Sequence, residues 1–102
     1  SEYDFESVSI DGDDILITIS YGGGCEDHHF RLCWDGSFME SHPVQVDLEL
    51  IHDGHGDACL AYITSTHRFS LVPLKEAWFE AYGTDTGTIM INGDGFSTLY
   101  EF

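Results

Sequence analysis

Residues 44–50 read Val-Gln-Val-Asp-Leu-Glu-Leu, and this stretch decides the fold class because apolar and polar residues alternate along its whole length. Successive side chains of a β-strand point to opposite faces of a sheet, so the alternation predicts a strand with one buried face. The same period recurs in residues 15–21 and 29–35. Residues 59–71 predict one or two further strands. Apolar side chains fall on both faces there, so we expect this segment to lie more centrally in a sheet.

Short turns and one helical segment complete the expected architecture. Asp11-Gly12 and Asn92-Gly93 stand between apolar segments and suit the positive φ angles of hairpin turns. Between Pro73 and Gly83, apolar residues recur at helical spacing: Leu74, Ala77, Trp78 and Ala81. We therefore expect residues 1–102 to form a single all-β domain. Its fold would be an antiparallel β-sandwich of about seven or eight strands with one short α-helix near residues 74–82.

The charge balance narrows the range of partners. Nineteen Asp and Glu residues against three Lys and Arg residues give a formal net charge of −16. Nucleic acids and anionic membranes attract clustered cations, and no apolar run approaches the length of a membrane span, so we expect neither nucleic-acid binding nor membrane insertion. Three interpretations of the acidity remain: a solvated surface, adaptation to high salt, or a face that binds a basic protein. The acids are spread along the chain, which favours the first two.

Two loops carry most of the chemically reactive side chains. If consecutive strands run antiparallel, the loops 22–28 and 52–58 emerge at the same end of the sandwich. Two of the three cysteines and four of the six histidines lie in or beside these loops: Cys25, Cys59, His28, His29, His52 and His55. Taken singly, each of these histidines is expected to be a solvated loop residue.

A disulfide between Cys25 and Cys59 is the first explanation for this clustering. Such a bond would favour a secreted or periplasmic location, where the environment is oxidising. Cys33 would then be left over, on the face of its strand opposite Phe30, Leu32 and Trp34. An unpaired cysteine is unusual in a secreted protein, and spacing alone does not fix the connectivity.

Two kinds of metal site are alternatives. The pairs Cys25-x-x-His28 and His52…Cys59 offer two thiolates and two imidazoles, a ligand set that suits a closed, structural zinc site. Asp53 and Asp57 could instead hold calcium, although the loop lacks the frame of an EF-hand. Acidic loops are more often simply solvated.

No catalytic constellation stands out in the sequence. Cys25 and His28 could form a thiolate–imidazole pair, but the neighbouring acids Glu26 and Asp27 would disfavour the thiolate. We therefore expect a small acidic, non-catalytic binding or accessory domain, either salt-tolerant or extracytoplasmic. Its small-molecule or protein ligand would contact the Cys/His-rich loop end. The alternatives are a zinc-binding structural or sequestering domain and an acidic module that binds a basic protein.

Overall fold

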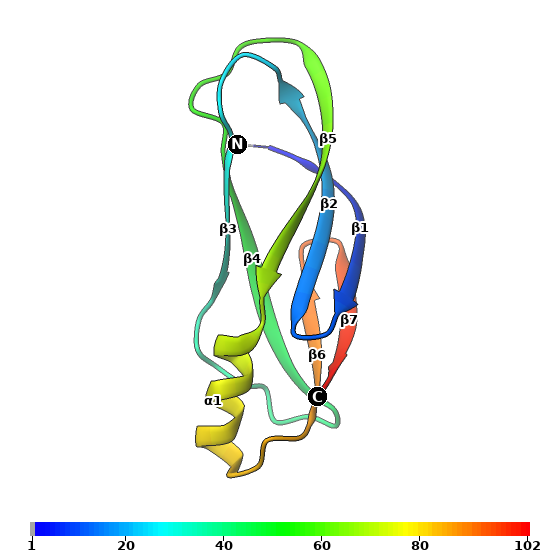
Figure 1. Cartoon of the computed structure of the whole chain (residues 1–102), viewed down its shortest axis with the longest axis vertical. Coiled ribbons are helices and arrows are strands. Elements are labelled where there is room, and N and C mark those ends of the chain that lie inside the picture. Colours follow the sequence, from blue (N-terminus) through cyan, green and yellow to red (C-terminus); the bar gives the residue numbers. More distant parts are fainter. Residues whose placement is uncertain (1) are drawn as a thin grey trace.

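The computed structural model describes residues 2–102 and confirms the all-β sandwich (Figure 1). Among these residues, seven strands and one helix follow one another in this order: β1 (Asp4–Asp11), β2 (Asp14–Gly23), β3 (His29–Trp34), β4 (Val44–Asp53), β5 (Ala61–Ser70), α1 (Val72–Tyr82), β6 (Thr88–Gly93) and β7 (Phe96–Glu101). Both predicted hairpin turns are present, joining β1 to β2 and β6 to β7.

The strands form two sheets, one in the order β1–β2–β5 and the other in the order β3–β4–β6–β7. All neighbouring strands are antiparallel except β4 and β6, which run parallel. The chain leaves the first sheet after β2, forms β3 and β4 in the second, and returns to the first sheet with β5. As a result, the β2–β3 and β4–β5 loops lie at the same end of the molecule (Figure 1).

The predicted central position of the segment 59–71 is wrong. Its strand, β5, pairs with β2 and forms an edge of the three-stranded sheet. The second apolar face, which suggested burial on both sides, instead faces solvent: Leu60 is 97% exposed and Tyr62 is 65% exposed.

The core is built from alternate residues of both sheets. Ile15, Ile17 and Ile19 of β2 face Val46 of β4 and the isoleucines of β6, and all are almost completely buried. Burying one such side chain stabilises the fold by about 1.5–3 kcal/mol, so the alternation in the sequence accounts for the two-layer packing.

The helix α1 covers the end of the sandwich opposite the two loops (Figure 1). It begins two residues earlier than predicted, with Pro73 in its first turn, and ends at Tyr82, followed by Gly83 as the C-cap with a φ of 72°. Leu74 and Trp78 are its buried residues. The indole Nε1–H of Trp78 donates to the carbonyl oxygen of Thr86 at 3.2 Å, which satisfies the polar atom of this buried ring.

Candidate functional site

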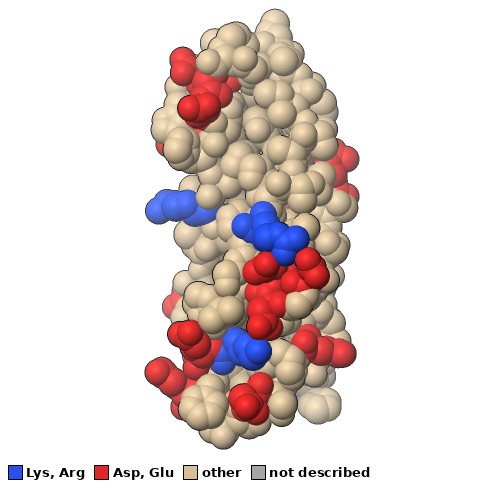
Figure 2. All heavy atoms as spheres, in the orientation of Figure 1, with Lys and Arg blue, Asp and Glu red and all other residues tan. Residues whose placement is uncertain are grey.

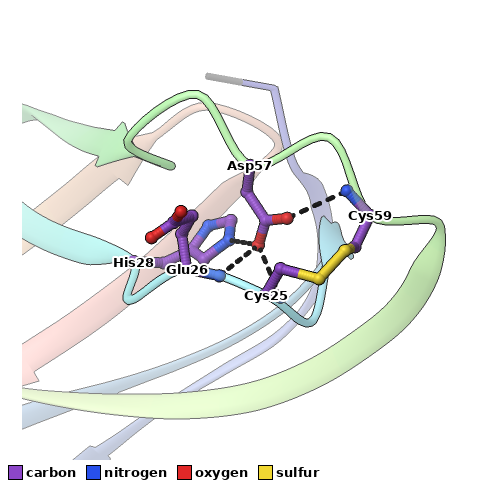
Figure 3. The surroundings of a disulfide bond; sticks show 5 residues. All are labelled: Cys25, Glu26, His28, Asp57 and Cys59. Atoms are coloured by element: carbon purple, nitrogen blue, oxygen red, sulfur yellow. Dashed lines mark hydrogen bonds and ion pairs between the residues drawn. A yellow bond between two sulfur atoms is a disulfide. The ribbon is translucent and has the colours of Figure 1, made fainter.

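The two reactive loops meet at one end of the sandwich, as the strand order predicted. Cys25 and Cys59 form a disulfide there, with 5.8 Å between their Cα atoms (Figure 3). Cys33 lies apart as an exposed free cysteine on β3, on the face that its position in the alternation indicated.

The carboxylate of Asp57 joins the loops a second time, and its side chain is only 1% exposed. Its Oδ2 accepts hydrogen bonds from the backbone N–H groups of Cys25 (3.2 Å) and Glu26 (3.1 Å) and from Nε2 of His28 (2.9 Å) (Figure 3). Its Oδ1 accepts from the N–H of Cys59 at 3.0 Å. The bond from His28, followed by those from the backbone, holds the pKa of Asp57 well below its usual range. The carboxylate therefore stays ionised at the centre of the junction.

A pair of histidines extends this network towards the N-terminal segment. Nδ1 of His28 lies 2.6 Å from Nε2 of His52, and Nδ1 of His52 lies 3.0 Å from the carbonyl oxygen of Glu2. Because the carboxylate of Asp57 and the carbonyl oxygen of Glu2 are acceptors, Nε2 of His28 and Nδ1 of His52 are the donors of these two bonds. We call Cys25, His28, His52, Asp57 and Cys59 the clasp.

The glycine run before Cys25 has a steric reason at two positions. Gly24 has a φ of 113°, and a Cβ there would lie 3.1 Å from the Cβ of Ala61. A Cβ atom on Gly23 would lie 2.6 Å from Nε2 of His28 and 2.7 Å from Oδ2 of Asp57. A Cβ on Gly22 would meet nothing within 4 Å. Gly23 therefore lets the backbone of β2 pass close to the hydrogen bond between His28 and Asp57.

The four candidate zinc ligands lie close together, but they bond to one another and to Asp57. The disulfide consumes both thiolates, and His28 and His52 bond to each other, so no tetrahedral set of two thiolates and two imidazoles is formed. Within residues 2–102, the close group of possible metal-ligating atoms is Cys25, Asp57 and Cys59, which includes both bridged sulfurs.

The two calcium candidates lie in different surroundings, and the expected solvation of two of the histidines is wrong. Asp57 accepts from four N–H donors, whereas Asp53 is exposed and accepts a hydrogen bond from the backbone N–H of His55 at 2.9 Å. The side chain of His28 is 5% exposed, and His52 is buried, so neither is the solvated loop residue that was expected. Their ring nitrogens have partners in Asp57, in each other and in the carbonyl oxygen of Glu2.

A groove of about 520 Å³ lies next to the clasp. Its lining residues are three tyrosines, three acidic residues, a serine and a glycine: Tyr3, Tyr21, Tyr62, Glu2, Asp4, Asp94, Ser20 and Gly22. The clasp supports one wall of this groove because the ring of Tyr21 packs against His28 and His52, with centroids 4.5 and 4.9 Å apart. We call this feature the tyrosine groove.

The electrostatic environment of the tyrosine groove is negative. The hydroxyl of Tyr62 donates to Oδ2 of Asp4 at 2.5 Å, and this bond raises the pKa of Tyr62. Burial raises the pKa of Tyr3, and the negative charges of Asp94 and Glu49 raise it further. No lysine or arginine is among the residues that line the groove. A cation there would be favoured over an anion.

Comparison with known proteins supports the fold. No protein-family model and no curated protein sequence matches this chain. A crystal structure of a NigD-like immunity protein from Bacteroides caccae is similar over the whole chain, with a TM-score of 0.66 and 17% sequence identity. The chain spans 54% of the length of that protein. At this identity the likeness establishes the all-β fold. Within residues 2–102, no helix is long and apolar enough to cross a lipid bilayer.

Sequence reasoning found the clasp cysteines and histidines but missed the tyrosine groove. The groove residues come from the starts of β1 and β5, the end of β2 and the turn between β6 and β7. No local spacing connects segments so far apart in the chain. The one available signal was Tyr62, an aromatic residue on what proves to be the solvent-facing side of its strand.

Proposed function

We propose that this domain is a non-catalytic binding module whose partner is a protein with a basic surface. The observation that carries this proposal is the surplus of uncompensated negative charge. Arg68 already pairs with Asp11 (3.1 Å) and Asp14 (2.7 Å), and Lys75 pairs with Asp13 (3.2 Å). On the face drawn in Figure 2, the blue side chains at the centre and near the lower end lie against red ones, whereas the blue side chain at the left edge stands apart from them. With a formal net charge of −16, most carboxylates lack an internal cationic partner.

A basic partner would relieve this imbalance. The repulsion among surface carboxylates falls when cations from another molecule approach, and the same field accelerates the encounter with a basic protein. A merely solvated or salt-adapted surface gives no reason for three carboxylates to gather around a groove walled by tyrosines. The groove therefore favours a binding face. The same fold in a NigD-like immunity protein also supports a binding role.

The same charge disfavours nucleic acid as a partner, because the phosphate backbone would meet carboxylates rather than lysine and arginine. The disulfide suits a protein that acts in an oxidising compartment such as the periplasm or the extracellular space.

Affinity capture under oxidising conditions, followed by titration calorimetry with the purified partner, tests the proposal. We expect a stoichiometric complex with a basic protein whose affinity falls steeply between about 0.1 M and about 1 M salt. The Debye length shrinks from about 10 Å to about 3 Å over this range. The matched control is the same partner with acetylated lysines, which should bind much more weakly. A neutral or acidic partner, or an affinity that does not respond to salt, would contradict the proposal.

A further inference from the structure

We propose that the tyrosine groove is the subsite that receives an arginine side chain of the basic partner. This inference rests on the proposed function and specifies where on the surface recognition occurs. It depends on three features of the groove, which are its aromatic walls, its carboxylates and its apolar rim.

The walls of the groove suit a flat cation. Tyr62 is 65% exposed and Tyr3 is partly buried, so these two rings can be reached from solvent, whereas the buried ring of Tyr21 lies on the core side of β2 against His28 and His52. A guanidinium group stacks on aromatic faces and is more weakly hydrated than an ammonium group. The volume of about 520 Å³ is ample for a single arginine side chain. These properties favour arginine over lysine.

The carboxylates are placed on both sides of the groove. Asp4 belongs to β1 of the three-stranded sheet, and Asp94 belongs to the β6–β7 turn of the four-stranded sheet. Asp4 holds the hydroxyl of Tyr62 through Oδ2, and its carboxylate has a second oxygen that can accept a hydrogen bond. A guanidinium group has five N–H donors in a planar fork, so it can donate to more than one carboxylate oxygen of the groove.

Next to the groove, an exposed leucine offers an apolar contact to the part of the partner protein that surrounds the arginine. Leu60 is 97% exposed and lies two residues before Tyr62, directly before the start of β5. Exposed aliphatic and aromatic side chains next to a charged subsite are typical of the buried centre of a protein–protein interface. The disulfide at Cys59 fixes the backbone directly before Leu60.

Amide chemical-shift mapping of the oxidised full chain tests the groove with a small probe. The probe is N-acetyl-arginine amide, and its matched neutral control is N-acetyl-citrulline amide, which has nearly the same shape without the charge. We expect shifts confined to the starts of β1 and β5, the end of β2 and the β6–β7 turn. The citrulline compound should bind at least about fivefold more weakly.

Variants locate the interaction. Asp94→Asn and Tyr62→Leu should each weaken binding of the arginine probe by about two- to fivefold, the range for one exposed ion pair or one cation–π contact. The control is Glu76→Gln on the exposed face of α1, which makes the same change in charge as Asp94→Asn at the other end of the molecule. It should leave the affinity unchanged, and the dispersion of each spectrum shows whether the variant is folded.

Scattered shifts over the acidic surface, equal binding of the citrulline compound, or equal effects of Asp94→Asn and Glu76→Gln would overturn the inference. These failures differ from a failure of the proposed function. If the purified partner still binds in a salt-dependent way, the proposal of a basic partner is kept and the assignment of the groove as its arginine subsite is rejected. If the arginine probe binds in the groove but the affinity for the partner does not change with salt, the proposed function is rejected instead.

Discussion

Loss of the Cys25–Cys59 disulfide should lower the stability of this domain more than any other single change at the loop end. The two cysteines are separated by 34 positions in the sequence. In the chain-entropy model, closing a loop of this length stabilises the folded state by about 4 kcal/mol. The entropy of unfolding is about 2.1 cal/mol/K per residue, so for 102 residues this free energy corresponds to a fall in Tm of about 18 °C.

Differential scanning calorimetry of the oxidised protein, the reduced protein and the variant Cys25→Ser/Cys59→Ser measures this effect. The reduced protein and the double variant should have similar Tm values, both far below that of the oxidised protein. Cys33→Ser is the matched control because Cys33 is exposed and unbridged, and it should keep the full difference between the oxidised and reduced states. A fall of less than about 5 °C on reduction would refute the entropic reasoning.

Three further predictions concern the surroundings of the clasp. Gly23→Ala should lower the free energy of unfolding by about 1–3 kcal/mol in urea titrations, because its Cβ would lie 2.6 Å from Nε2 of His28, whereas Gly22→Ala should have almost no effect. Equal effects of the two substitutions would contradict this. Asp57→Asn should lower the Tm at neutral pH. Since the folded-state pKa of Asp57 lies below its unfolded value of about 3.9, the difference from wild type should shrink as the pH falls below about 4, and a constant difference would be evidence against the network. Burial lowers the pKa of His67, so its NMR titration midpoint should lie below about 6.5, and the stability that the neutral imidazole contributes should be lost as the pH falls below that value. A midpoint above 6.5 would be inconsistent with this burial.

Most of the strand and helix positions could be predicted because their signals are local. The period of two in residues 44–50 and the apolar spacing around Trp78 each reflect the geometry of one element. The meeting of the two loops also followed from sequence, since antiparallel progression alone places residues 22–28 and 52–58 at one end.

The sheet partners could not be predicted in the same way. The edge position of β5 depends on which strands of the other sheet cover it, and Leu60 and Tyr62 carry no local mark of their exposure. The parallel pairing of β4 with β6 is possible because β5 and α1 intervene and return the chain to the same end before β6 begins. Such choices depend on contacts between distant segments.

The chemistry of the candidate site could be predicted only in part, because it also depends on contacts between distant segments. The pairing of Cys25 with Cys59 followed from the topology, but the role of Asp57 did not. An acidic residue in a glycine-rich loop suggests solvation, and only the N–H donors of residues 25 and 26, together with the ring of His28, change that expectation. The tyrosine groove needed four separate segments and gave no pattern in the sequence.

The most direct test of whether the basic partner binds at the tyrosine groove, and not anywhere on the acidic surface, compares two double variants of equal charge. Asp4→Asn/Asp94→Asn removes carboxylates of the tyrosine groove, whereas Glu76→Gln/Glu80→Gln removes exposed carboxylates of α1 at the opposite end. At about 0.1 M salt, the affinity for the purified basic partner should fall about tenfold in the groove variant and less than about twofold in the helix variant. Equal losses of affinity in the two variants would contradict the account.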